Sequence, residues 1–209
     1  MGKSKRQSNH LLPNRTFTNN EVEVKREIEM RPDGKSVLAV SLDLSSAPVP
    51  DRKYLADVAS IISTSHSIKL LFAQNKLNGD LRTLLVVDIS SEVAQKYIKA
   101  VDEMPGTNFQ QIAALNKQPI PELSIFTDEP EQTIAFKANA LSGAVSGLDA
   151  CLDFYYISPV AMRNFMQTDK IDIDAVVRVD MHVNLFVSLI NELRKIASNY
   201  PVVEEFKND

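Results

Sequence analysis

Apolar and polar residues alternate near the start of the chain, which is the pattern of half-buried β-strands. The first alternating residues are Val22, Val24, Ile28 and Met30. A second apolar run covers residues 37–44, and the Pro-Asp-Gly sequence at residues 32–34 favours a turn between the two runs. The pattern therefore predicts a β-hairpin.

Four later segments show the same alternation and predict further strands. They cover residues 67–73, 81–89, 150–157 and 175–183. Two other segments have apolar residues every three or four positions, as on the buried face of a helix. We expect these helices over residues 93–104 and 185–197, each shortly before a proline.

Two stretches of equal length have the same ends. ADVASIISTSHSIKLLF covers residues 56–72, and ANALSGAVSGLDACLDF covers residues 138–154. A predicted strand that contains an aspartate, Asp88 or Asp180, follows each stretch and leads into a predicted helix. The register without gaps predicts a repeated unit of three strands and one helix. We expect an α+β fold of two β-β-β-α units, with an antiparallel sheet and helices packed on one face.

These elements divide the chain into four parts. The expected parts are a flexible basic tail (1–20), a first unit with its N-terminal hairpin (21–116), a linker (117–131) and a second unit (132–209). The tail is expected to be flexible because it has too little apolar surface to offset the entropy of ordering it.

The repeated stretches resemble a known family. Residues 54–74 and 137–159 are similar to a small bacterial domain of unknown function, whose pattern runs from Ala-Asn through two strands to a Leu-Asp-Phe triplet, a third strand and a helix. The second copy matches directly at Ala138-Asn139 and at residues 152–154, whereas the first has Asp57 and Leu71 at two of these positions. The resemblance implies the β-β-β-α core and no catalytic residues.

Composition narrows the class of protein. Hydrophobic residues make up 44% of the 209 positions, which is enough for a buried core, and no apolar run is long enough to cross a bilayer. The chain has a single cysteine, Cys151, and therefore no internal disulfide. We expect a cytoplasmic protein without a membrane partner.

Charge is distributed unevenly along the chain. The net charge is −4, yet residues 1–20 carry four basic residues and no acidic one: Lys3, Lys5, Arg6 and Arg15. Such a tail could contact phosphates, but it lacks interleaved aromatic residues, so a solubilising role is favoured over nucleic-acid binding.

Candidate chemistry is sparse. Six glycines without a GxxxxGK or GxGxxG motif exclude the usual phosphate loops, and three distant histidines with one cysteine give no zinc pattern. Asp169, Asp172 and Asp174 could bind a hard cation, although a solvated loop is the favoured interpretation. Asp88 and Asp180 precede helices, where capping is favoured over catalysis. We expect no cofactor, no metal and no catalytic residue.

The remaining expectation concerns binding. Two helices can cover one face of a sheet, yet the predicted strands have apolar residues on both faces. The residues assigned to the uncovered face are Leu71, Leu84, Val86, Tyr155 and Val176. The sequence thus predicts a non-enzymatic interaction protein and a homo-oligomer that buries this face or pairs sheet edges, with a further protein partner as an option. The alternatives are a chaperone similar to the export chaperone SecB, a nucleic-acid-associated protein that uses the tail, and an enzyme with a dispersed site.

Overall fold

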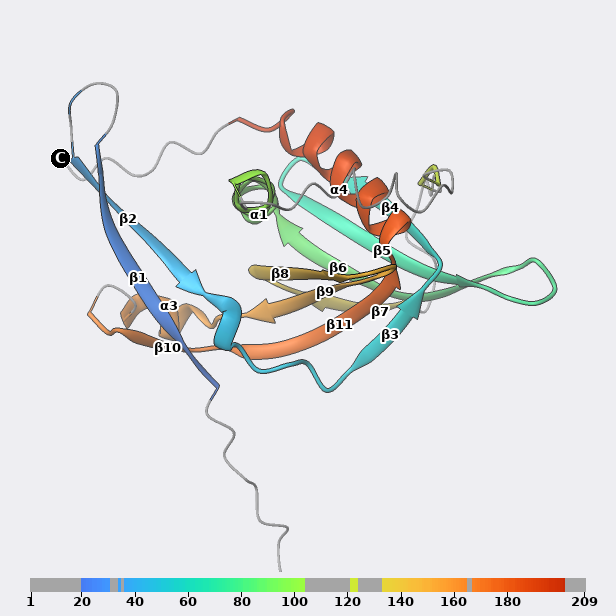
Figure 1. Cartoon of the computed structure of the whole chain (residues 1–209), viewed down its shortest axis with the longest axis horizontal. Coiled ribbons are helices and arrows are strands. Elements are labelled where there is room, and N and C mark those ends of the chain that lie inside the picture. The colour runs from blue at the N-terminus through green and yellow to red at the C-terminus, as the bar shows by residue number, and fades with distance from the viewer. Residues whose placement is uncertain are drawn as a thin grey trace, which may run out of the picture.

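The described residues form three β-sheets and a pair of packed helices, and the α+β class is as expected (Figure 1). The computed structural model describes residues 20–30, 34, 36–103, 121–123, 133–164 and 167–201. The strands are β1 (Glu21–Met30), β2 (Ser36–Asp43), β3 (Lys53–Ala56), β4 (Val58–Ser63), β5 (Ser67–Asn75), β6 (Leu81–Ser90), β7 (Ile134–Lys137), β8 (Ala140–Ser146), β9 (Asp149–Tyr156), β10 (Lys170–Asp172) and β11 (Asp174–His182). The helices are α1 (Ser91–Glu103), α3 (Pro159–Asn164) and α4 (Val183–Ala197), with a short 3-10 helix, η1, at Leu44–Ser46.

The strands form one three-stranded sheet and two four-stranded sheets. The hairpin sheet has the order β10-β1-β2, the β5 sheet has the order β4-β5-β6-β7, and the β9 sheet has the order β3-β11-β9-β8. The predicted hairpin, the four long strands and both long helices are present within a few residues of their expected bounds. The alternation did not reveal the short elements β3, β7, β10 and α3, because three to six residues carry too little periodicity.

Residue pairs correspond between the β5 sheet and the β9 sheet. Lys69 pairs with Asp88 in the first, and Cys151 pairs with Asp180 in the second. Two complete rows across the sheets also correspond: Ser60, Leu71, Val86 and Ala135 in one, and Ser142, Asp153, Arg178 and Lys53 in the other. Phe72 follows Leu71 in the first row, and Phe154 follows Asp153 in the second.

The short strands β3 and β7 depart from the expected antiparallel sheet. Strand β7 pairs in parallel with β6, and β3 pairs in parallel with β11, so each four-stranded sheet is mixed. Strand β3 comes from the first half of the chain and lies in the sheet of the second half. Strand β7 comes from the second half of the chain and lies in the sheet of the first half. The two halves thus exchange one strand each, and the expected single antiparallel sheet is wrong on this point.

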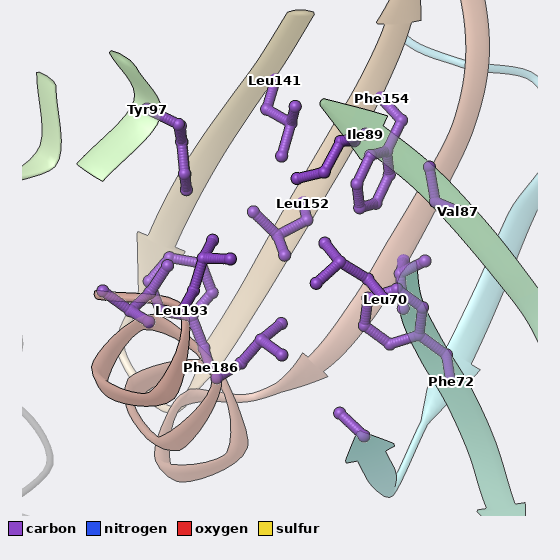
Figure 2. Close-up of a cluster of buried hydrophobic side chains, with 14 of the residues drawn as sticks. Leu70, Phe72, Val87, Ile89, Tyr97, Leu141, Leu152, Phe154, Phe186 and Leu193 are labelled. Carbon is purple, nitrogen blue, oxygen red and sulfur yellow. The ribbon is translucent and has the colours of Figure 1, made fainter. Parts of the chain in front are cut away.

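One hydrophobic core joins the two four-stranded sheets (Figure 2). The rings of Phe72 and Phe154 meet edge to face with centroids 6.1 Å apart. Around this contact lie Leu70, Val87 and Ile89 of the β5 sheet with Leu141, Leu152, Val177 and Val179 of the β9 sheet. An edge-to-face aromatic pair contributes roughly 0.5–1.5 kcal/mol beyond its buried area. Because both sheets contribute to one core, neither half buries its apolar residues alone.

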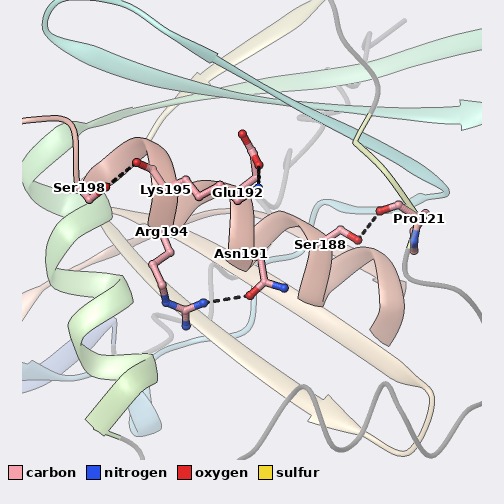
Figure 3. A network of polar contacts seen from close by, with 7 residues as sticks. All are labelled: Pro121, Ser188, Asn191, Glu192, Arg194, Lys195 and Ser198. Atoms are coloured by element: carbon pink, nitrogen blue, oxygen red, sulfur yellow. Dashed lines mark hydrogen bonds and ion pairs between the residues drawn. The ribbon is translucent and has the colours of Figure 1, made fainter.

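The helices α1 and α4 close one side of this core (Figure 1). They contact each other, and each also contacts the edge strand of the other half, α4 against β4 and α1 against β8. Gln95 Nε2 donates to the carbonyl of Ala197 over 3.1 Å, and Arg194 pairs with Asp102 over 2.5 Å. Ser188 in α4 donates to the carbonyl oxygen of Pro121 over 2.6 Å (Figure 3). The helix pair therefore links the two halves a second time.

The Ala-Asn and Ala-Asp dipeptides that begin the repeated stretches have a structural role. Asn139 Oδ1 accepts from the Ile157 amide over 2.7 Å, and its Nδ2 donates to the Ile157 carbonyl over 2.8 Å. Asp57 Oδ2 accepts from the Asn75 amide over 3.2 Å at the corresponding place. Each side chain fixes the backbone at the end of a long strand, so Asn139 and Asp57 have a structural role.

Gly143 lets α1 approach β8. A Cβ atom at this position would lie 2.3 Å from Tyr97 Oη and 3.3 Å from Phe186 Cζ. The Tyr97 hydroxyl is buried and has no hydrogen-bond partner in the described part of the chain, and burial raises its pKa. A buried hydroxyl without a partner adds no stability.

Among the helices that the structure describes, none has the length and apolar composition that a membrane crossing requires.

We predict that Gly143→Ala destabilises the protein by about 1–3 kcal/mol, because the new methyl group overlaps the Tyr97 hydroxyl. Tyr97→Phe alone should be close to neutral, and Gly143→Ala should cost clearly less in the Tyr97→Phe background. Urea unfolding of the four proteins measures this coupling. Equal costs of Gly143→Ala in both backgrounds would contradict the proposed contact.

Candidate interaction surface

The sheet face that the sequence assigned to a partner is largely buried within one chain. Leu71 is 0% exposed, Val86 is 1% exposed and Tyr155 is 2% exposed. Leu71 and Val86 form a small cluster with Ala73 and Val58 on the outer side of the β5 sheet. The expectation that these residues lie uncovered in a single chain is therefore wrong, and none of the three can contact a second chain in this conformation.

The other two assigned residues lie at β-bulges. The β5–β6 register shifts between Phe72 and Ala73, which leaves Leu84 unpaired, and the β9–β11 register shifts between Ala175 and Val177, which leaves Val176 unpaired. A bulge adds one residue to a strand and interrupts the alternation of its side chains. Leu84 and Val176 consequently pack, half-buried, against the main core. Strict alternation placed them on the wrong face.

The base of the β1–β2 hairpin covers Tyr155. Val22 and Val24 pack there with Tyr155, Ile157, Ile171 and Ile173. Strand β1 pairs with β10 over residues 21–23, so the hairpin associates with the second half of the chain and not with the β5 sheet. The hairpin can cover apolar surface despite its many charges because alternation places the glutamates of β1 on its opposite face.

A partly buried ion pair lies beside Tyr155 on the outer face of the β9 sheet. Arg178 Nε and Nη2 each donate to a carboxylate oxygen of Asp153 over 2.6 Å, and the Tyr155 hydroxyl donates to Asp153 over 3.4 Å. The hydrogen bond to Asp153 raises the pKa of Arg178. Leu71 and Val86 take the corresponding positions of the β5 sheet. The hydrogen bonds from Arg178 and Tyr155 to Asp153 indicate that this ion pair has a structural role.

The described residues do not assemble a nucleophile with a base. Cys151 is half-buried, and burial raises the pKa of its thiol, which disfavours the reactive thiolate. His66 lies in the exposed β4–β5 turn, and His182 Nδ1 accepts from the Asn184 amide over 3.2 Å at the start of α4. His182 is thus a helix cap.

The capping role expected for Asp88 and Asp180 belongs to other residues. Ser90 Oγ accepts from the Val93 amide over 3.2 Å at the start of α1, as His182 does at α4. Asp88 and Asp180 lie two residues before these caps, within strands, opposite Lys69 and Cys151.

The carboxylates proposed as cation ligands do not form a site, and the basic residues of the tail lie outside the described residues. Asp169 pairs with Arg26 over 2.7 Å, while Asp172 and Asp174 are exposed on either side of Ile173. Within the described ranges, no three His, Cys, Asp or Glu residues are placed to hold a metal ion. Lys3, Lys5, Arg6 and Arg15 lie outside the described residues, as do residues 117–120 and 124–131 of the expected linker.

The far half of the hairpin projects from the rest of the molecule (Figure 1). Its side chains continue the apolar face that begins at Val22 and Val24, but here Ile28 is 74% exposed and Met30 is 68% exposed. Arg26 fixes the point of departure, because its guanidinium donates to Asp169 and to the Thr168 carbonyl. Lys25 Nζ lies 2.6 Å from the Asp43 carboxylate on the other face, and this hydrogen bond lowers the pKa of Asp43.

Most sheet edges in the described structure are protected against pairing. Strands β3, β7 and β10 have four, four and three residues, and each contains a lysine: Lys53, Lys137 and Lys170. Strands β4 and β8 are longer, and each lies against a helix. Short strands, lysines and covering helices are the usual means by which proteins prevent association at sheet edges.

Strand β2 has none of these protections. It is the edge of the hairpin sheet over eight residues, and its sequence SVLAVSLD is uncharged up to Asp43. The Val24 amide donates to Asp169, away from β2, so Leu42 and the alternate residues Val40, Leu38 and Ser36 direct their amides and carbonyls outward. Among the described residues, no strand pairs with this side of β2. The candidate site is therefore the outer edge of β2 together with the exposed apolar residues Ile28 and Met30.

We predict that Asp153 and Arg178 can be replaced together at little cost in stability, whereas replacing either one alone destabilises the protein. Asp153→Leu or Arg178→Val alone should cost about 2–4 kcal/mol, because each leaves a desolvated charge without its partner. The double variant reproduces the leucine–valine pair of the β5 sheet and should lie within about 1 kcal/mol of the wild type. Urea unfolding tests this, and single costs that simply add in the double variant would contradict it.

No family model matches the chain, and the searches of curated proteins and of solved structures found no match either. The resemblance of residues 54–74 and 137–159 to a small bacterial domain consequently stays a prediction.

Proposed function

We propose that this chain is a non-enzymatic interaction protein that binds a partner strand at the open edge of β2. Added strands gain affinity from main-chain hydrogen bonds and specificity from alternate side chains. The main-chain hydrogen bonds would come from the outward amides and carbonyls of Ser36, Leu38, Val40 and Leu42. The side-chain specificity would come from the apolar face of the hairpin.

The observation that carries this proposal is the contrast between β2 and the other edges. A strand that is long, uncharged and uncovered is a template for pairing with another chain. The other edge strands of the described sheets are shortened, carry a lysine or lie against a helix. The far half of β1 also lacks a described partner strand on its outer side, but it carries Lys25 and Glu27, so β2 is the long uncharged exception among the described edges.

The rest of the fold is consistent with a rigid support for the hairpin. We interpret the corresponding registers of the two halves as a duplicated strand-strand-strand-helix unit, with a preceding short strand exchanged between copies. The shared core and the helix pair hold this body together, and the hairpin base is packed on it through Val22 and Val24. A rigid base lets a projecting edge bind without first becoming ordered, which lowers the cost of association.

The alternatives have less support among the described residues. A SecB-like holdase was expected to use the sheet face at Leu71 and Tyr155, and that face is buried in one chain. The described residues offer no activated nucleophile to support an enzyme, and the basic tail of the nucleic-acid alternative is not among them.

The proposal is tested with a fluorescent strand-forming peptide, KTVTVTVTK, whose binding is followed by anisotropy. We expect saturable binding that weakens at least tenfold in Val40→Pro, which removes an outward amide without removing a β1–β2 hydrogen bond. Ser41→Lys should weaken binding as well, because it adds an edge charge.

Ser146→Lys is the matched control, since it makes the same change at an exposed serine of β8. It should bind the peptide like the wild type. Absence of saturable binding to the wild type, or equal binding by Val40→Pro and Ser41→Lys, would rule out strand addition at this edge.

A further inference from the structure

We infer that the strand that pairs with β2 is the β2 of a second copy of this chain, which gives a two-fold symmetric dimer with a continuous six-stranded sheet. This inference rests on the proposed use of the β2 edge and adds the identity of the partner. Three features of the hairpin favour a second copy over an unrelated strand.

The first feature is the self-complementary sequence of β2. In an antiparallel pair centred on Ala39, Leu38 lies opposite the partner's Val40, and Ser36 lies opposite the partner's Leu42. These are the residues whose amides and carbonyls point outward. Each of the two pairs occurs twice in the dimer, and the two residues of a pair exchange two hydrogen bonds. This register pairs the whole uncharged run from Ser36 to Leu42 with its counterpart, so no charged residue lies within the paired run.

The second feature is the distribution of charge in the hairpin. The exposed glutamates lie on β1, at Glu21, Glu23 and Glu27, and not on β2. Pairing through β2 separates the two β1 strands by three strand spacings, about 14 Å. That separation exceeds the screening length of about 8–10 Å at physiological salt, so repulsion between the two acidic strands is weak. Association through β1 would instead bring these glutamates together.

The third feature is the uncovered far half of the hairpin. A two-fold axis perpendicular to the sheet keeps both apolar faces on one side and sets the far half of each hairpin beside the base of the other. The base carries the body of its own subunit on that side, through Val22 and Val24. Ile28 and Met30 therefore turn toward the partner's body in the dimer, whereas a single added strand would leave them in water.

The inference is tested by sedimentation equilibrium and by disulfide trapping. The wild type should sediment as a dimer of the 23.3 kDa chain at micromolar concentration, and Val40→Pro and Ser41→Lys should sediment as monomers with unchanged circular dichroism. Persistence of the dimer in both variants would overturn pairing through β2, even if one of them were partly unfolded.

Trapping tests the register in a Cys151→Ser background. Ala39→Cys should form an interchain disulfide on mild oxidation, because directly opposed residues that do not exchange hydrogen bonds lie about 4.5 Å apart at Cα. Ser41→Cys is the matched control and should remain reduced, since its counterpart lies four residues out of register. A disulfide in Ser41→Cys and none in Ala39→Cys would overturn the register centred on Ala39.

The two proposals fail in distinguishable ways. A wild type that is monomeric yet binds KTVTVTVTK with the expected sensitivity to Val40→Pro would refute the second copy as partner and leave strand addition in place. A monomer that binds no strand would refute both.

Discussion

The exchange of the short strands β3 and β7 is the constraint on which the rest of the structure depends. Each four-stranded sheet is completed by a strand from the other half of the chain, so neither sheet can form fully without the other. The contact between Phe72 and Phe154 lies in the core that this exchange creates, where each ring packs against its counterpart. The helices α1 and α4 also connect the two halves, because each lies against an edge strand of the other half. We therefore regard the two halves as one folding unit.

This shared core has a consequence for the surface. The inner faces of both sheets are used for the core, and the outer faces are also covered at Leu71, Val86 and Tyr155. What remains open is the hairpin, which is anchored by its base and by Arg26 but otherwise stands apart from the body. The binding site we propose thus arises from the hairpin, whose two strands contribute no described residue to the common core.

Sequence patterns predicted the long elements, because alternation and helical spacing are strong signals in segments of eight residues or more. They did not predict the exchange, since β3 and β7 are short and their partners lie far away in sequence. Leu84 and Val176 were placed on the wrong face because a bulge has no signature in an alternating pattern. The burial of Tyr155 was missed for a different reason: its cover comes from Val22 and Val24, which lie far away in the sequence. The uncharged edge of β2 could be read from the sequence, but its lack of cover could be recognised only once the positions of the other edges were known.

Residue-resolved hydrogen exchange at two protein concentrations tests both the open β2 edge and the shared core most directly. The amides of Leu38, Val40 and Leu42 should exchange rapidly in dilute protein and slowly in concentrated protein, while those of Val37, Ala39 and Ser41, which pair with β1, should show little change. Amides of β5 and β9 should exchange together at the slowest rate, because one core holds both sheets. Protection at Val40 that does not depend on concentration, or separate exchange of β5 and β9, would contradict this account.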